Sequence, residues 1–317
     1  IAGTHGKTTT SSILTFILVE SGVKTSAFLG GIPKNYHSNF IDRGHDWIVE
    51  EADEYDRSFL QLFPDIAVIG SLDADHLDIY GDRSKMVSSY LDFAHQIKKP
   101  GLLLMSASIQ ESDLNRFRQL NNVKLLTYGI DSGDVKSRIL SIHEGWTTFN
   151  YQDEKGNLFN ELKLRLPGKH NLQNVTAAIR IAVELGINES AIRKALMSFQ
   201  GIVRRFEWLF EGNSQVYIDD YAHHPEELRA AIEATKSCYP GRKILGIFQP
   251  HLYTRTRDFA KDFAKVLDML DEVILVELYP AREEAIEGIG SQTILDLMEL
   301  EKKSFVLKRD LIEDLKS

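Results

Sequence analysis

A glycine-rich segment near the start of the chain constrains the fold more than any other feature. It reads Gly3-Thr4-His5-Gly6-Lys7-Thr8-Thr9, and it joins the apolar residues Ile1 and Ala2 to a stretch with helical apolar spacing. Glycines allow successive N–H groups to point at phosphate oxygens, and a helix N-terminus adds partial positive charge. We expect Lys7 to reach β- and γ-phosphates and the Thr8 hydroxyl to bind Mg²⁺. An ordinary glycine turn remains the alternative, because Gly3 and Gly6 are closer together than in the usual phosphate loop.

Alternating strand and helix patterns predict an α/β fold with two domains. The expected strands and helices of the first series occupy residues 7–20, 47–49, 66–69, 85–97, 102–105 and 110–120, and those of the second occupy 216–219, 225–237, 243–248, 257–270 and 272–276. Alternation of this kind favours a parallel sheet covered on both faces. Residues 137–167 instead resemble an antiparallel hairpin insertion, and two helices follow at 171–185 and 189–199. We therefore predict a nucleotide-binding domain over 1–200 and a smaller, Rossmann-like α/β domain over 201–317.

Composition excludes some classes of protein. The net charge of -9 argues against binding to nucleic acid or to an anionic membrane. No apolar run reaches the ~20 residues that a membrane helix needs. The single cysteine, Cys238, excludes an internal disulfide framework and is typical of a reducing compartment. These features predict a cytoplasmic protein with no nucleic-acid or membrane partner.

Acidic and histidine side chains follow two of the predicted strands. Glu51 lies in Glu50-Glu51-Ala52-Asp53-Glu54, and His76 lies in Asp73-Ala74-Asp75-His76. Ligands of open parallel sheets bind beyond the carboxyl ends of the strands, so both segments are expected to face the phosphate loop. Oxygen ligands suit Mg²⁺. Thr8 and Glu51 are therefore candidate magnesium ligands, although either segment could also be solvated charge.

At this point the sequence resembles the Mur ligase superfamily over essentially its whole length. The resemblance rests on these ordered motifs: GTHGKTTT from Gly3, EEADE from Glu50, DADH from Asp73, HNLQN from His170, RRF from Arg204, DDYAHHP from Asp219, FQPHLYTRTR from Phe248 and YPA from Tyr279. The C-terminal motifs are similar to those of the branch that joins L-alanine to the carboxylate of UDP-N-acetylmuramate. The resemblance implies an ATP- and Mg²⁺-dependent ligase that forms an acyl phosphate during peptidoglycan synthesis, as a monomer or a weak homodimer.

The same resemblance implies three domains, of which this chain matches the second and third. The domain that grips the uridine nucleotide is expected to be absent. We accordingly expect this chain alone to bind Mg-ATP and to turn over poorly.

Nucleotide and metal roles follow from the resemblance. Lys7 and the loop from Gly3 to Thr9 would hold the triphosphate, and Thr8 and Glu51 would bind Mg²⁺ between the β- and γ-phosphates. His76, with Glu51, would bind a second Mg²⁺ that bridges the γ-phosphate and the substrate carboxylate.

The adenine contacts are expected downstream. His170, Asn171 and Asn174 are candidates, although Asn171 could simply cap the following helix. Arg204 or Arg205 lies near the predicted hinge, and Arg205 is our candidate to reach the nucleotide as the C-terminal domain closes.

The C-terminal motifs are expected to form an alanine pocket from Tyr221, His223, His251 and Arg255. Arg255 would pair with the amino-acid carboxylate through its planar fork. His251 is the candidate base that takes a proton from the incoming ammonium group.

Two departures from the family pattern bear on these roles. Leu252 stands where the family commonly has an arginine, so Arg255 or Arg257 is expected to carry its task. Related branches carry a carbamylated lysine at the place of Leu91, so no such modification is expected. His224 is expected to be structural.

Two rival functions remain open on the sequence. A ligase that attaches a recycled tripeptide to the same muramoyl nucleotide shares nearly all the motifs before the hinge. A simple phosphate-loop NTPase, or an ATP-binding chain without ligase activity, is the second rival, but it gives no reason for DDYAHHP.

Overall fold

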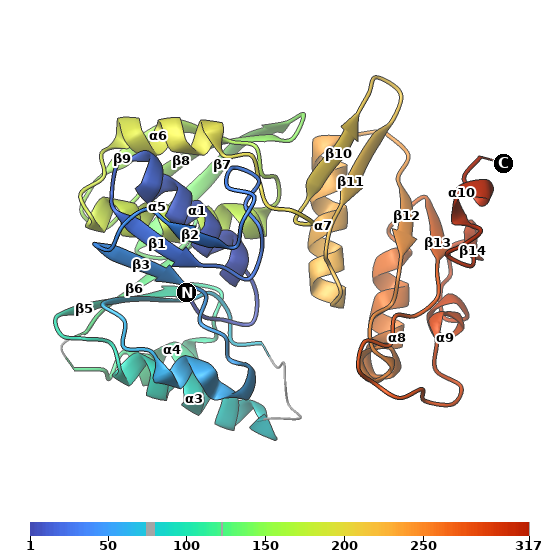
Figure 1. Ribbon diagram of the computed structural model, residues 1–317, viewed down its shortest axis with the longest axis horizontal. Coiled ribbons are helices and arrows are strands. Elements are labelled where there is room, and N and C mark those ends of the chain that lie inside the picture. Colours follow the sequence, from blue (N-terminus) through green and yellow to red (C-terminus); the bar gives the residue numbers. More distant parts are fainter. Residues whose placement is uncertain (74–79, 122, 317) are drawn as a thin grey trace. The chain divides into compact units, whose positions relative to one another are not determined.

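The chain forms two compact units, one spanning Ile1–Ile218 and the other Asp219–Ser317. The structure is a computed structural model that describes residues 1–73, 80–121 and 123–316. Figure 1 shows the elements of both units coloured along the sequence.

A six-stranded sheet forms the centre of the first unit, in the order β4-β5-β6-β7-β8-β9. Its strands are β4 (Ile66–Ile69), β5 (Gly101–Ser106), β6 (Val123–Ile130), β7 (Val135–His143), β8 (Trp146–Gln152) and β9 (Leu158–Leu164). The pairs from β4 to β7 are parallel, whereas β7, β8 and β9 pair in antiparallel fashion. The antiparallel strands predicted as an insertion thus extend the main sheet itself.

A smaller sheet, β2-β1-β3, meets this sheet at the start of the phosphate loop. Its strands are β1 (Thr25–Phe28), β2 (Phe40–Asp42) and β3 (Trp47–Glu50). The N–H of Ala52 donates to the carbonyl of Ile1 at 2.8 Å, and the N–H of Ala2 donates to the carbonyl of Val68 at 2.8 Å. The two residues before the loop therefore join both sheets and fix where the loop begins.

Strand side chains alternate between two cores on opposite faces of the main sheet. Val68 and Leu104 belong to one core, whereas Ile69 and Met105 belong to the other. This alternation follows from the two-residue period of a strand. Both faces are covered, so the strands read as continuous apolar runs.

Helices cover the two faces as separate layers (Figure 1). The first core is covered by α1 (Lys7–Glu20), α5 (Lys169–Glu184) and α6 (Glu189–Ser198), and the second by the 3₁₀ helix η1 (Tyr55–Gln61), α3 (Arg83–His95) and α4 (Glu111–Phe117). The predicted helix over 7–20 has the bounds that the sequence indicated, and the other helices of this series differ by a few residues.

A two-stranded ribbon of β10 (Glu207–Glu211) and β11 (Val216–Asp219) lies at the end of the first unit, and only Asp219 falls beyond its boundary. The guanidinium of Arg165 lies 4.7 Å from the ring centroid of Trp208 and forms an ion pair with Glu211. Lys34 Nζ lies 3.0 Å from Glu207 Oε1. These contacts explain why residues 201–218 group with the first unit.

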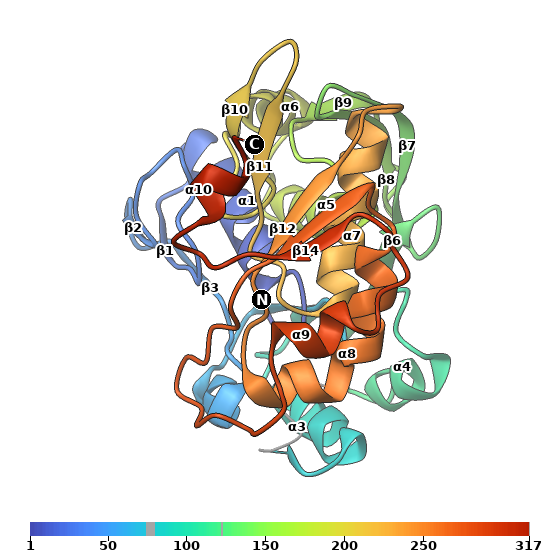
Figure 2. The ribbon, with the colours of Figure 1, turned by 90° about the vertical axis from the view of Figure 1, so that its right-hand side faces the viewer.

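The second unit has its own parallel sheet, β12-β13-β14 (Figure 2). Its elements are α7 (Pro225–Cys238), β12 (Leu245–Phe248), α8 (Tyr253–Leu267), β13 (Glu272–Leu275), α9 (Ser291–Leu295), β14 (Lys303–Phe305) and α10 (Leu311–Asp314). A buried cluster including Ile232, Phe263, Leu267 and Val273 forms its core. In the portion of the chain that the structure describes, no helix combines the length and the apolar character needed to span a bilayer.

Candidate functional site

The phosphate loop adopts a backbone that only glycine suits at two positions. Gly3 has φ 123° and Gly6 has φ 81°, both in the region that L side chains rarely adopt. A Cβ on Gly6 would lie 2.3 Å from Asn174 Oδ1, and one on Gly3 would lie 2.8 Å from the backbone nitrogen of Gly70. Gly6 is also the N-cap of α1 and supplies no capping side chain. The loop therefore presents bare backbone at the start of a fourteen-residue helix.

Thr4 and His5 tie the loop to the segment that follows β4. The His5 N–H donates to Ser71 Oγ at 2.9 Å, and the Thr4 hydroxyl donates to the carbonyl of Asp73 at 3.1 Å. His5 Nε2 also lies 3.7 Å from Asp73 Oδ2. Both side chains act here on the shape of the loop, and their predicted contact with phosphate stays a prediction.

Thr8 and Glu51 lie side by side next to the loop. The Thr8 hydroxyl donates to Glu51 Oε1 at 3.0 Å, and the Gly30 N–H donates to Glu51 Oε2 at 2.7 Å. A Cβ on Gly30 would lie 2.6 Å from the same carboxylate, and one on Gly31 would lie 2.7 Å from Thr8 Cγ2. The glycine pair thus allows a hydroxyl and a carboxylate to be held together.

This pair of oxygens suits a hard divalent cation such as Mg²⁺. Within residues 1–73, 80–121 and 123–316, no group of three His, Cys, Asp or Glu side chains converges as a protein-only metal site. That arrangement is compatible with Mg²⁺, which commonly keeps waters and takes only one or two carboxylates beside phosphate. The predicted ligand His76 lies outside the residues that the structure describes.

Lys7 forms an ion pair with a buried carboxylate that the sequence did not predict. Its Nζ lies 2.7 Å from both Oε1 and Oε2 of Glu54, and it donates to the carbonyl of Gly3 at 2.9 Å. The EEADE segment signalled acidic residues at this strand end, but the spacing did not show which of them meets Lys7. Glu54 was therefore left without a role.

The predicted adenine residues lie in different environments. Asn174 is buried against Gly6, directly over the phosphate loop. Asn171 is also buried, and its amide donates to the carbonyl of Pro167 at 2.7 Å; it does not cap α5, whose N-cap is Gly168 without a side-chain capping bond. His170 is exposed and Arg205 is half-buried. Their contact with a nucleotide stays a prediction.

In the second unit, His251 is the centre of a polar and aromatic cluster. Its ring stacks on Tyr279 at 5.5 Å between centroids and meets His223 edge-on at 6.1 Å. Burial, together with the positive charge of Arg255 and the neighbouring His223, lowers the pKa of His251 below its usual value. A neutral imidazole at pH 7 can accept a proton.

Arg255 lies one helical turn beyond His251, at the start of α8. Its Nη1 is 3.3 Å from His251 Nδ1. A guanidinium only donates, so Nδ1 accepts, and a neutral imidazole would carry its proton on Nε2. Arg257 instead pairs with Asp258, with Nε 2.7 Å from Oδ1. Of the two arginines considered, Arg255 is the one that contacts the histidine.

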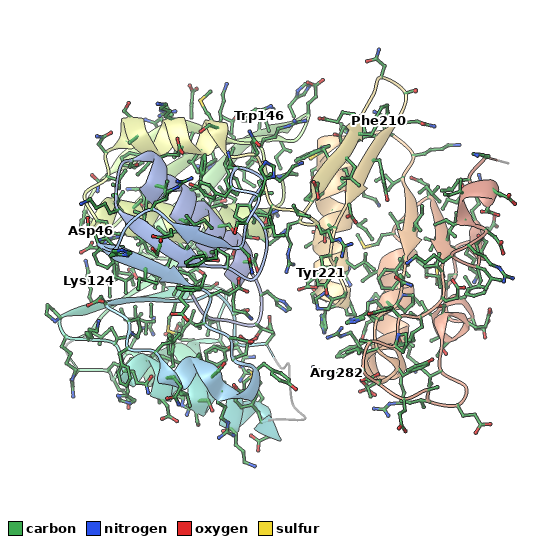
Figure 3. All side chains as sticks on the ribbon, in the orientation of Figure 1. Asp46, Lys124, Trp146, Phe210, Tyr221 and Arg282 are labelled. Atoms are coloured by element: carbon green, nitrogen blue, oxygen red, sulfur yellow. The ribbon has the colours of Figure 1, made fainter. Side chains whose placement is uncertain are left out.

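The other predicted pocket residues lie on the loop between β11 and α7. Tyr221, labelled in Figure 3, is exposed and meets His223 edge-on at 5.2 Å. His223 Nδ1 is 2.9 Å from the carbonyl of Tyr221, which fixes Nδ1 as a donor. His224 packs edge-on against Phe259 at 4.8 Å. Tyr221, His223 and His251 thus belong to one cluster, whereas His224 contacts the core side of α8.

Leu252 occupies the N-cap of α8 with φ 72° and ψ 136°. Its N–H donates to the carbonyl of Tyr279 at 3.0 Å. Glu283 accepts from the Thr254 N–H at 3.0 Å and from the Thr254 hydroxyl. The first turn of α8 is therefore held by Glu283 and Tyr279, so position 252 contributes backbone to this cluster.

Comparison with known proteins supports the family resemblance over the whole chain. The model of the Mur ligase middle domain matches residues 1–182, and the model described as "Mur ligase, glutamate ligase domain" matches residues 204–315. The curated UDP-N-acetylmuramate–L-alanine ligase of Flavobacterium psychrophilum is 46% identical over 319 residues, which cover 100% of this chain and 68% of the relative. The ligase of the same name from Cytophaga hutchinsonii is 42% identical and covers 99% of this chain and 67% of the relative.

A solved structure agrees with these sequence matches. The UDP-N-acetylmuramate–alanine ligase of Thermotoga maritima matches with a TM-score of 0.81 and 28% identity, over 100% of this chain and 68% of that one. Two family models together span most of the chain, and the curated relatives exceed two-fifths identity. The chain therefore belongs to the Mur ligase family.

Proposed function

We propose that this chain carries the catalytic residues of an ATP-dependent ligase that joins L-alanine to the carboxylate of UDP-N-acetylmuramate. The observation that carries the proposal is the grouping of Lys7, Thr8 and Glu51 at the phosphate loop, in a chain 46% identical to a curated ligase of that name. ATP would transfer its γ-phosphoryl group to the muramoyl carboxylate. The alanine amine would then displace phosphate from that acyl phosphate to form the amide.

In the first unit, the chemistry requires that two anions approach each other. The Lys7 ammonium and the backbone at the start of α1 supply positive potential at the triphosphate. Asn174, packed against Gly6, lies where it could contact the nucleotide as well as the loop. These groups act mainly by positioning and by charge neutralisation, as expected for phosphoryl transfer.

Thr8 and Glu51 are the residues that would hold Mg²⁺. Bound there, the cation would neutralise charge on the phosphate oxygens during transfer. The Gly30 N–H keeps the Glu51 carboxylate directed at the Thr8 hydroxyl, 3.0 Å away. This arrangement prepares both oxygens without a rearrangement of the backbone.

In the second unit, Arg255 and His251 would bind and activate alanine. Arg255 Nη1 lies 3.3 Å from His251 Nδ1 and donates to it. When the guanidinium turns to the alanine carboxylate, it releases the Nδ1 lone pair, which can then take a proton from the alanine ammonium group. Binding of the substrate carboxylate would thereby expose the base. Tyr221 and His223 would line the same pocket.

Phosphate release from ATP tests this proposal. The 317-residue chain is incubated, at high enzyme concentration because slow turnover is expected of it alone, with Mg-ATP, UDP-N-acetylmuramate and either L-alanine, glycine, L-serine or the recycled tripeptide. Release that depends on L-alanine supports the ligase. Release that is indifferent to any amino acid would favour a phosphate-loop NTPase, and release driven by the tripeptide would favour the recycling ligase. Calorimetry with Mg-ATP tests the nucleotide half separately.

A further inference from the structure

The ion pair between Lys7 and Glu54 carries an inference that rests on the proposed ATP site and goes beyond it. Glu54 is 3% exposed, and both its carboxylate oxygens lie 2.7 Å from the Lys7 ammonium. A carboxylate this deeply buried is costly unless a cation accompanies it. Lys7 is therefore the cation that compensates for burial of the Glu54 carboxylate.

The backbone carbonyl of Glu54 accepts two hydrogen bonds. The hydroxyl of Tyr80 donates to the carbonyl of Glu54 at 2.6 Å, and Tyr80 is itself buried. The Arg57 N–H donates to the same carbonyl at 3.0 Å, which begins η1. Both contacts restrict where the Glu54 carboxylate can move.

The donors of Lys7 can be counted. An ammonium group has three N–H donors and no acceptor. Among the described residues, the Gly3 carbonyl accepts one at 2.9 Å and Glu54 Oε1 accepts a second at 2.7 Å, which leaves one N–H. The Gly3 carbonyl belongs to the phosphate loop itself, so the two partners hold the ammonium across the loop.

We propose that Glu54 is a positioning residue that holds the Lys7 ammonium in place so that its remaining N–H donates to a phosphate of ATP. If Lys7 left Glu54 to bind phosphate, the buried Glu54 carboxylate would lose its cation. If Lys7 donates its third N–H to phosphate instead, the ion pair with Glu54 stays intact. Lys7 thus binds phosphate from a fixed position, and little side-chain entropy is lost when ATP arrives.

The opposite role would be a latch, in which Glu54 competes with phosphate for Lys7. The two roles predict opposite signs. If Glu54 positions Lys7, loss of its carboxylate weakens ATP binding. If Glu54 competes, the same loss strengthens ATP binding.

Calorimetry with ATP and AMP distinguishes these roles in the 317-residue chain. We expect Glu54→Ala to weaken Mg-ATP binding by at least about tenfold, because an unpositioned lysine binds phosphate less well. Glu54→Gln keeps an acceptor oxygen and is expected to stay within about threefold of the wild type. AMP lacks the β- and γ-phosphates, so its affinity is expected to be unchanged in both variants.

Glu50→Gln is the matched control, since Glu50 is an exposed acid of the same EEADE segment and its neutralisation is expected to leave ATP affinity unchanged. Circular dichroism and thermal melting report whether each variant folds. Tighter ATP binding by Glu54→Ala and Glu54→Gln would overturn the proposal in favour of the latch. Equal losses for ATP and AMP would overturn it in favour of a structural role.

A wild-type chain that bound no ATP would overturn both this inference and the proposed function. That result is seen before any variant is made. If the wild type binds ATP but the Glu54 variants do not show the expected loss of ATP affinity, only the inference about Glu54 is overturned.

Discussion

Replacing Gly30 by alanine tests the Thr8–Glu51 pair without changing either residue. Gly30 is not among the glycines with positive φ, so alanine introduces no backbone strain there. The added Cβ would lie 2.6 Å from both Glu51 oxygens, where 3.4 Å is an ordinary contact. The carboxylate must therefore retreat by about 0.8 Å, which is comparable to the ~1 Å misplacement that can cost about 10²-fold in a catalytic site.

This displacement is expected to weaken the Mg²⁺-dependent part of ATP binding by about 10- to 100-fold, or roughly 1.4–2.8 kcal/mol. Binding of ATP in the presence of EDTA is expected to be unchanged, because Lys7 and the loop backbone remain. Calorimetric titrations with and without Mg²⁺ measure both terms. Gly290→Ala is the control, since a Cβ at Gly290 meets nothing within 4 Å. Mg²⁺-dependent affinity within about twofold of the wild type would refute the assignment of Glu51 as a magnesium ligand.

Three further predictions concern other parts of the chain. NMR titration should show a His251 pKa below its ordinary value, and Arg255→Met should bring it closer to that value because Arg255 contributes to the lowering. Because the pKa of His251 is lower in the folded than in the unfolded chain, protonation of His251 should reduce the free energy of unfolding as the pH falls from about 6.5 toward the folded-state pKa. A His251 pKa that is the same in Arg255→Met as in the wild type would contradict the role given to Arg255. Arg255→Lys keeps the charge but loses the planar fork, so the KM for L-alanine should rise about tenfold while the KM for ATP stays unchanged in steady-state assays. Equal rises in both KM values would exclude binding of the alanine carboxylate by Arg255. Arg180 is 0% exposed and pairs with Glu154 and Glu184, so Arg180→Met should cost about 3–5 kcal/mol in urea unfolding, whereas the same change at Lys155, whose side chain is 44% exposed, should cost under about 1 kcal/mol.

The segments that were predicted are those in which apolar residues gather, either at helical spacing or in a continuous run. The helix over 7–20 and the strand over 66–69 have the bounds that their apolar spacing indicated. The strands β1, β2 and β14 were not predicted because they mix polar with apolar residues, whereas the equally short strand over 66–69 is a continuous apolar run. The antiparallel pairing of β7 to β9 was predicted, but its place in the main sheet depends on the pairing of β6 with β7.

In the candidate site, residues within a local motif were predictable, whereas contacts between distant segments were not. Lys7 and Thr8 became candidates because the loop motif fixes their neighbours in sequence. Glu54 was missed because its contact with Lys7 spans 47 residues and depends on the turn into η1. Tyr279 was noticed in a motif, but its stacking on His251 follows from a strand-end bridge that no local pattern shows.

The tight packing around the loop glycines bears on how such a chain can diversify. Alanine at Gly3, Gly6, Gly30 or Gly31 would meet another atom within 2.8 Å, so the nucleotide half tolerates almost no change at these places. Tyr221 and Tyr279 in the second unit are about half exposed and have room to vary. Under the proposed assignment, substitutions at such exposed positions of the second unit can change which amino acid is accepted while the packing around the phosphate loop stays unchanged.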